Sequence, residues 1–234
     1  MVQPSAALIV LRESDYWPSA IANLTELCGR QGGAARVEAA KYAEVYAGRR
    51  GSMVVDVVAS RQRKYSGRVL KIVERWESAA PDTSLRTLAD TGIDAPTYGL
   101  QEAEADTIQA VAKNLARYGS DSGWNEDETC KIWADRCEGV EHAPRLDPVV
   151  GSVKGIGPAL FAYMRMRSGA SAIKADIRVK KSLRGLGFGV PDSDSATMVI
   201  AHAAAEEMDM DLLVLDQLLW HANGSTNSSI GEQS

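Results

Sequence analysis

The segment Val153-Lys154-Gly155-Ile156-Gly157-Pro158 leads into a mostly apolar run, 159–166, and is the most informative part of the sequence. Pro158 suits the first residue of a helix, because an N–H at that position would have no partner within the helix. Gly155 and Gly157 permit a tight turn and the close approach of another backbone. The N–H groups at the start of this helix would then point outward, as a site for a phosphate oxygen. Turns between packed helices also carry Gly-x-Gly pairs, so the pair alone does not define a function.

The rest of the chain also has helical spacing of its apolar residues, as in Val69, Ile72, Val73 and Trp76. The run 53–59, Met-Val-Val-Asp-Val-Val-Ala, is the best strand candidate. We interpret it as a buried helix, because it continues into the next helical stretch without a turn signal. Gly and Pro clusters at 29–33, 81–82, 92–96, 119–123 and 144–148 predict breaks between helices of roughly 8–15 residues. The sequence therefore predicts an all-α fold.

Composition places the chain among ordinary globular proteins. Of its 234 residues, 45% are hydrophobic and 24% are charged, which argues against disorder over most of the length. The apolar stretch 6–11 is too short to span a bilayer and lacks the pattern of a signal peptide, so we expect a cytoplasmic protein without a membrane partner. Three cysteines cannot all pair, which fits a reducing compartment. The Ser-, Asn- and Gly-rich tail 224–234 is expected to be disordered.

Charge is distributed unevenly around a net value of −5. Residues 61–75 hold six basic side chains against Glu74, and residues 153–184 hold eight against Asp176. Residues 191–234 hold eight acidic side chains and no Lys or Arg. Two basic stretches in an acidic body are typical of a localised phosphate-binding surface. Solvated faces of two helices would give the same pattern, so charge alone leaves both interpretations open.

A second signal, Lys174-Ala175-Asp176-Ile177-Arg178-Val179-Lys180-Lys181, follows the hairpin. Hairpin and second signal together resemble the helix–hairpin–helix superfamily of base-excision DNA glycosylases, in which a catalytic Asp follows such a hairpin at this spacing. Ser60-Arg61-Gln62 is similar to the family's Ser-x-Gln element, whose Gln enters the gap left by the extruded nucleotide. The run Asp216-Gln217-Leu218-Leu219-Trp220-His221 is loosely similar to the family's last helix. The resemblance covers about residues 50–222.

This resemblance implies two helical subdomains that flank a DNA-binding cleft within one domain, 1–223. Residues 52–166 would form a central bundle that ends in the hairpin, and residues 1–51 with 167–223 would form the second subdomain. The chain departs from the family at two places. Ala159 stands where bifunctional members have a nucleophilic Lys, so we expect no lyase activity. The last cysteine, Cys137, precedes the hairpin, so an iron–sulfur cluster is not expected.

Cleavage of an N-glycosidic bond develops positive charge on the sugar, which a fixed carboxylate stabilises while it orients or deprotonates a water molecule. The resemblance assigns this catalytic role to Asp176, and the basic residues around it should keep it ionised. The plain alternative is that Asp176 caps the helix that starts at Ile177, a common role for Asp. One side chain can serve both purposes.

Further site residues follow from the need to flip a base out of the duplex. We expect the hairpin and the two basic stretches to contact DNA through Lys154, Gly155, Ile156, Gly157, Arg61, Gln62, Arg63, Lys64, Arg178, Lys180 and Lys181. Weaker candidates for the base pocket are Tyr65, Trp76, Tyr163 and His221, although aromatic residues at helical spacing more often belong to a core. Cys130, Cys137 and His142 match no common zinc site, so no metal is expected. The family often holds a monovalent cation at the hairpin carbonyls.

The sequence therefore favours a monomeric, monofunctional DNA N-glycosylase that acts on double-stranded DNA without a cofactor. Its target would be an alkylated or deaminated base, as in repair, or a bulky modified base of phage DNA, as in defence. The first alternative is a non-catalytic helix–hairpin–helix module that binds DNA. The second is a helical interaction protein with no affinity for nucleic acid.

Overall fold

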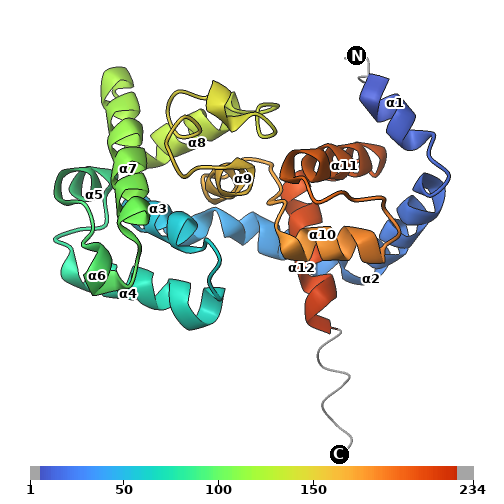
Figure 1. Ribbon diagram of the computed structural model, residues 1–234, viewed down its shortest axis with the longest axis horizontal. Helices are drawn as coiled ribbons and strands as arrows, with labels where there is room; N and C mark the ends of the chain where they lie inside the picture. The colour runs from blue at the N-terminus through green and yellow to red at the C-terminus, as the bar shows by residue number, and fades with distance from the viewer. Residues whose placement is uncertain (1–5, 226–234) are drawn as a thin grey trace, which may run out of the picture. The chain divides into compact units, whose positions relative to one another are not determined.

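A computed structural model describes residues 6–225, and every regular element among them is a helix (Figure 1). The predicted all-α class is thus confirmed for this part of the chain. The chain divides into two compact units: residues 43–170 form one, and residues 1–42 with 171–234 form the other. The expected subdomain boundaries, 51/52 and 166/167, lie close to these but do not coincide with them.

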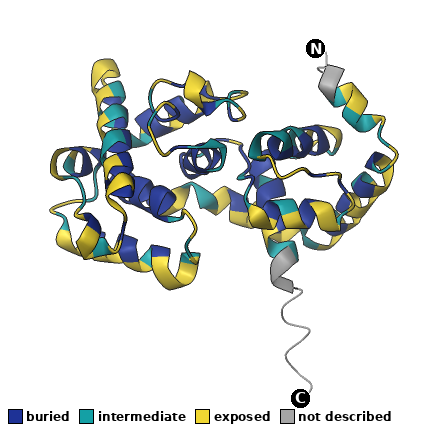
Figure 2. Ribbon diagram, viewed as in Figure 1, coloured by how far each residue is buried: buried dark blue, intermediate teal, exposed yellow. Residues whose placement is uncertain are grey.

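Unit 43–170 is a helical bundle around one central helix, α3. Its elements are the 3-10 helices Glu44–Tyr46 and Pro144–Leu146, α3 (Arg50–Ala59), a π-helix (Tyr65–Val69), α4 (Leu70–Ala79), α5 (Leu85–Thr91), α6 (Ala95–Tyr98), α7 (Glu102–Ser122), α8 (Glu126–Arg136) and α9 (Pro158–Arg167). All ten residues of α3 are buried (Figure 2). Helices α4, α5, α7, α8 and α9 all pack against α3. This environment explains why the apolar run 53–59 lacks a polar face, and it confirms that the run is a buried helix.

Trp76 belongs to this core. Its side chain is 3% exposed, and a Cβ atom at Gly51 would lie 2.8 Å from its ring. Gly51 thus permits α3 and α4 to approach each other closely. The suggestion that Trp76 stacks on an extruded base is therefore wrong, because both faces of a core ring are covered by protein.

Within residues 6–225 the second unit contains five helices, with α12 at its centre. They are α1 (Ala6–Arg12), α2 (Trp17–Tyr42), α10 (Ile177–Gly185), α11 (Asp194–Glu207) and α12 (Leu212–Ser225). Helix α12 packs against α2, α10 and α11. The core is formed by the Leu stripe of α12 together with Leu24, Leu183 and an edge-to-face pair of Trp17 and Phe188.

Two sequence expectations about helix ends are corrected. The Gly cluster 29–33 does not break a helix, because α2 continues through it for 26 residues. Leu24 and Leu27 before the cluster and Ala35 and Ala39 after it are buried on one face, and this packing outweighs the low helix propensity of glycine. Helix α12 extends through Ser225, so the first two residues of the expected disordered tail are helical. Residues 226–234 lie outside the described part of the chain.

None of the helices in residues 6–225 combines the length and the apolar character that a membrane span requires.

Candidate nucleic-acid interface and catalytic carboxylate

The hairpin 153–157 is a tight turn held against α7. The Ile156 N–H donates to the Val153 carbonyl at 3.1 Å, and the Thr107 hydroxyl donates to the Lys154 carbonyl at 2.9 Å. Gly155 has a φ of +97°, and a Cβ atom there would lie only 2.5 Å from the Thr107 Oγ1. Both its backbone conformation and this close approach therefore require glycine. Lys154 and Gly155 are exposed, whereas Ile156 is buried and anchors the turn.

The first arm of the hairpin is a series of turns, 148–155, and no helix. Asp147 organises it, because its carboxylate accepts hydrogen bonds from the N–H groups of Val150 and Gly151, each at 2.7 Å. The indole N–H of Trp133 donates to the same carboxylate at 3.2 Å. The described segment is thus a capped turn, a hairpin and one helix, α9.

Helix α9 begins without a side-chain cap. Gly157 occupies the N-cap position in an extended conformation, and Pro158 follows as the first helical residue. No acceptor among the described residues meets the N–H of Gly155 or Gly157. Helices α5, α6, α8, α10 and α11 all have a capping side chain at this position. The start of α9 therefore presents unpaired donors and the positive end of a helix dipole.

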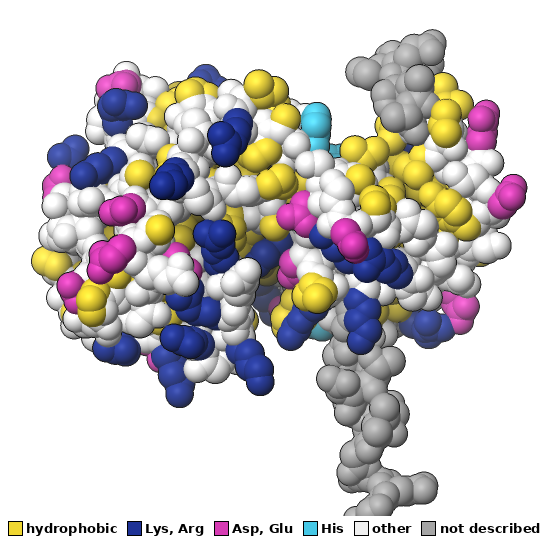
Figure 3. All heavy atoms as spheres, in the orientation of Figure 1, with side chains coloured by type: hydrophobic (Ala, Val, Ile, Leu, Met, Phe, Trp, Pro, Cys, Tyr) yellow, Lys and Arg dark blue, Asp and Glu magenta, His cyan; other side chains and the backbone are white. Residues whose placement is uncertain are grey.

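A loop with a left-handed residue follows α3. Gln62 has a φ of +55° and is exposed, as are Arg61 and Lys64 on either side of it. A non-glycine residue in this conformation costs about 1 kcal/mol, so the surrounding structure must hold it. The π-helix Tyr65–Val69 comes next, a form that often occurs near functional sites. Figure 3 shows Lys and Arg side chains gathered along the lower edge of this unit, over the π-helix and α4.

Arg63 has a structural role in this loop. Its guanidinium forms two hydrogen bonds of 2.6 Å each with the Glu104 carboxylate at the start of α7. Both side chains are nearly buried. Burial would raise the pKa of Glu104, but the hydrogen bonds from Arg63 and from the Gln101 N–H outweigh it and lower the pKa. The structure thus corrects the expectation that Arg63 contacts a phosphate: its charge is already neutralised.

Tyr65 and Tyr163 surround a buried ion pair. Arg167 of α9 lies 3.3 Å from the Asp56 carboxylate of α3, and the hydroxyls of Tyr163 and Tyr65 donate to that carboxylate at 3.0 and 3.3 Å. The Arg167 guanidinium also lies within 6.0 Å of the ring centroids of Tyr46, Tyr65 and Tyr163. Burial raises the pKa of Asp56, and Arg167 opposes this effect. Tyr163 is 3% exposed, so its assignment to a base pocket is wrong, while Tyr65 is half-buried.

Asp176 is the N-cap of α10 in the other unit. Its Oδ1 accepts hydrogen bonds from the N–H groups of Arg178 at 2.9 Å and Val179 at 3.0 Å. Its Oδ2 accepts none from the described residues, and the side chain is half-buried. The capping role is thus confirmed, and one carboxylate oxygen is left uncommitted by it.

The α10 surface next to Asp176 combines apolar and basic groups. Ile177 is 82% exposed, and the Arg178 guanidinium lies 4.6 Å from the ring centroid of Trp220 on α12. Lys181 is exposed, whereas Lys180 is paired with Asp194. His221 is half-buried, with its ring edge-to-face to Trp220.

The buried carboxylate of Asp216 interacts with Asp176, and the sequence alone does not single it out. It lies on the buried face of α12 and is 4% exposed, and its Oδ1 accepts a hydrogen bond from the Lys174 N–H at 3.0 Å. The signal was present in the sequence, because position 216 is in phase with the apolar stripe Leu212, Leu215 and Leu219. An Asp at such a position is rare unless it has a partner.

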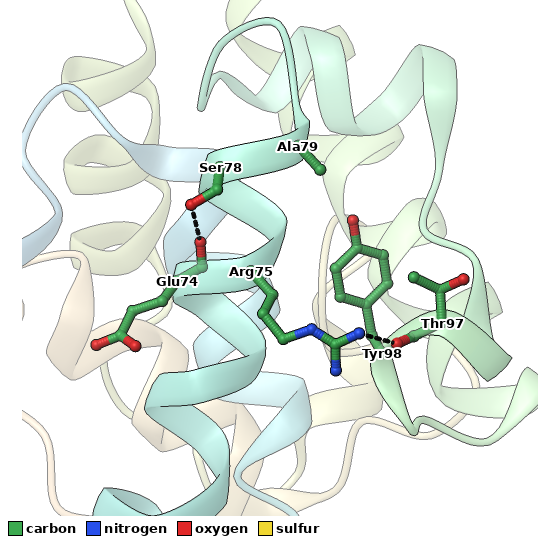
Figure 4. A pocket seen from close by; sticks show the side chains of 6 residues that line it. All are labelled: Glu74, Arg75, Ser78, Ala79, Thr97 and Tyr98. Atoms are coloured by element: carbon green, nitrogen blue, oxygen red, sulfur yellow. Dashed lines mark hydrogen bonds between the residues drawn. The ribbon is translucent and has the colours of Figure 1, made fainter.

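A separate surface cavity of about 340 Å³ lies between α4 and α6 and contains none of the predicted site residues (Figure 4). Arg75 crosses it, donates to the Thr97 carbonyl at 2.5 Å and lies over the Tyr98 ring. At the other side of the cavity, the Ser78 hydroxyl donates to the Glu74 carbonyl at 2.8 Å.

The described residues contain no group of three or more His, Cys, Asp or Glu side chains arranged to hold a metal ion. Cys130 and Cys137 are buried free thiols, and burial raises the pKa of each to about 12.

Comparison with known proteins gave no matching family model, no matching curated protein and no matching solved structure.

Proposed function

We propose that this protein is a monofunctional DNA N-glycosylase with Asp176 as its catalytic carboxylate. The observation that carries the proposal is that the two carboxylate oxygens of Asp176 have different roles. Oδ1 caps α10, and Oδ2 accepts no hydrogen bond from the described residues. Asp176 is also half-buried, and it lies close enough to the fully buried carboxylate of Asp216 to interact with it electrostatically.

The proposed hydrolysis of the N-glycosidic bond requires few other groups of the protein. The bond between the sugar C1′ and the base nitrogen breaks, and its electron pair leaves with the base, which is then protonated. The Asp176 carboxylate stabilises the positive charge that develops on the sugar and accepts a proton from the water molecule that bonds to C1′. Ala159, which stands where a nucleophilic Lys would be needed, can form no Schiff base.

Unit 43–170 supplies the features expected of a DNA contact. The hairpin and the start of α9 present unpaired N–H groups to a phosphate, with Lys154 exposed beside them. The loop with Arg61, Gln62 and Lys64 offers two exposed cations on either side of a side chain that can enter the duplex. A helical glycosylase fold, a monomeric state, a cytoplasmic location and independence of cofactors are parts of the same proposal.

The target base belongs to one of two classes, either alkylated and deaminated bases or bulky modified bases of phage DNA. The small Ala159 at the hairpin corner favours an enlarged base, because it leaves more room there than an aromatic residue would. The corresponding biological roles are repair and defence.

The test compares Asp176→Asn with Asp94→Asn. Asn caps a helix about as well as Asp does, so both variants should fold, and Asp94 is the matched control because it caps α6 in the same way. An aldehyde-reactive probe would count abasic sites in DNA treated with each protein. We expect abasic sites from the wild type and Asp94→Asn, and none from Asp176→Asn. Borohydride should trap no covalent complex with any of them.

The second candidate function is a DNA-binding module without catalysis, and the capping bonds of Asp176 favour it, because they explain this residue without any reaction. In that case Asp176→Asn and the wild type would both bind DNA in a salt-dependent manner, and neither would produce abasic sites.

A further inference from the structure

The residues just before α10, which end in Asp176, are held in place by a buried carboxylate on α12. Asp216 accepts the Lys174 N–H on its Oδ1 at 3.0 Å. Within the segment, the Asp176 N–H donates to the Lys174 carbonyl at 2.7 Å, so a three-residue turn joins the two residues. Any displacement of Lys174 is therefore passed to Asp176 through a single short turn.

The position of Asp216 is costly for a carboxylate, which indicates a purpose. It is surrounded along α12 by Leu215, Leu218 and Leu219, each 0% exposed. Its Oδ2 has one partner, the side-chain amide of Gln217, at 3.1 Å. An apolar residue would pack there without the desolvation cost that a carboxylate bears. Packing alone therefore does not account for an Asp at this place.

Helix α12 also holds α10 at two further points. The Ser182 hydroxyl donates to the Leu219 carbonyl at 2.6 Å, and Arg178 stacks on Trp220. Because α10 is already fixed by these contacts, the bond from Asp216 is needed for the segment before α10 and not for the helix itself.

We infer that Asp216 is the positioning residue of the proposed catalytic site: it fixes the Lys174–Asp176 turn and thereby aims the uncommitted oxygen of Asp176. This role rests on the proposed function. Asp216 itself is buried and has no access to DNA, so it acts only through Asp176.

The charges around Asp216 give this role a pH signature. The helices packed on α12 are α2, α10 and α11, and the charged groups that act on Asp216 are Lys174 and Asp176, both from the segment before α10. Burial raises the pKa of Asp216 to about 7, and the nearby charge of Asp176 adds to this effect. Above neutral pH the ionised Asp216 accepts the Lys174 N–H more strongly than the protonated acid does and so fixes the turn that aims Asp176 more firmly, and we expect the rate of base release to rise through pH 7.

The experiment measures single-turnover base release and DNA affinity for Asp216→Ala, Asp216→Asn and Leu215→Ala. Asp216→Ala removes the acceptor of the Lys174 N–H, and we expect base release to slow roughly 10- to 100-fold with unchanged DNA affinity. Asp216→Asn keeps an oxygen that can accept the Lys174 N–H, so below pH 6 it should release the base at close to the wild-type rate. It cannot ionise, so its rate of base release should not rise through pH 7. Leu215→Ala is the packing control on the same helix, and it should lower stability without slowing release.

The outcomes separate this role from the proposed function. If the wild type releases a base, Asp176→Asn does not, and Asp216→Ala matches the wild type, then only the role of Asp216 is wrong. The same holds if Leu215→Ala slows release as much as Asp216→Ala does. If the wild type releases no base from any DNA, the proposed function and the role of Asp216 both fail. As a readout independent of activity, amide hydrogen exchange at Lys174 should be faster in Asp216→Ala; unchanged exchange would contradict the hydrogen bond on which the role depends.

Discussion

Some basic side chains of this protein are paired with an acidic side chain and others are exposed, and the two kinds occur close together in the sequence. Arg61 and Lys64 are exposed, while Arg63 between them is bound to Glu104 by two hydrogen bonds. In the same way, Lys181 is exposed and Lys180 is paired with Asp194. Charge counted along the sequence cannot separate these cases, because the pairing depends on which helix end lies opposite.

This division predicts different effects for three Ala substitutions in one loop. Arg61→Ala and Lys64→Ala should each weaken DNA binding and lower the slope of log affinity against log salt by about 1, with the free energy of unfolding unchanged. Arg63→Ala leaves the Glu104 carboxylate buried without its partner, so it should lower the free energy of unfolding by about 3 kcal/mol. Fluorescence anisotropy at several salt concentrations and urea denaturation measure the two effects. A stable Arg63→Ala variant with a reduced salt slope would show that Arg63 binds phosphate after all.

The raised pKa of Asp216 predicts that the free energy of unfolding depends on pH. Its pKa in the folded protein is raised to about 7 from 3.8, so between pH 4 and pH 7 the folded state binds more protons than the unfolded chain. The contribution of Asp216 to the free energy of unfolding must therefore fall as pH rises through this window, by up to about 4 kcal/mol. Asp216→Asn cannot titrate, so its stability relative to the wild type should increase from pH 4 to pH 7 in urea denaturation. A difference that is constant with pH would mean that Asp216 is ionised throughout.

The sequence predicts where helices form, but it does not predict the tertiary contacts that extend or distort them. Apolar spacing predicts α4, and the absence of a turn signal predicts α3. The sequence could not indicate that α2 continues through its glycines, because that depends on burial of Leu27 and Ala35 on one face. The left-handed Gln62 and the π-helix after it depend on tertiary contacts and have no local signature. The hairpin glycines were predictable, because turn geometry is encoded by residue type.

The hairpin predicts opposite behaviour for two glycines that are two residues apart. Gly155→Ala forces a side chain into positive φ and against Thr107, so it should lower the free energy of unfolding by about 1–3 kcal/mol. At Gly157 the φ is −105° and a Cβ atom would meet nothing within 4 Å, so Gly157→Ala should fold normally. Its methyl group would stand beside the unpaired N–H groups at the start of α9, and DNA affinity should fall.

Gly33→Ala in α2 is the control for this pair, because a Cβ atom there also meets nothing within 4 Å. It should leave DNA affinity unchanged. Thermal unfolding and anisotropy would be measured on all three variants. Wild-type affinity in Gly157→Ala would remove the start of α9 from the DNA contact.

At the scale of the whole molecule, the chain combines two compact units, and each holds one part of the proposed chemistry. Residues 43–170 contain the hairpin and the Gln62 loop, and the other unit contains Asp176 and Asp216. Two crossings of the chain, after Tyr42 and after Ala170, join the units.

Mass spectrometry of bases released from a DNA panel would test the central claim most directly. The panel would comprise unmodified, alkylated, deaminated and hypermodified phage DNA, treated with the wild type and with Asp176→Asn. The predicted result is the release of one class of modified base by the wild type alone, which would also name the substrate. Release by both proteins, or by neither, would contradict the assignment of Asp176 as the catalytic carboxylate of a DNA glycosylase.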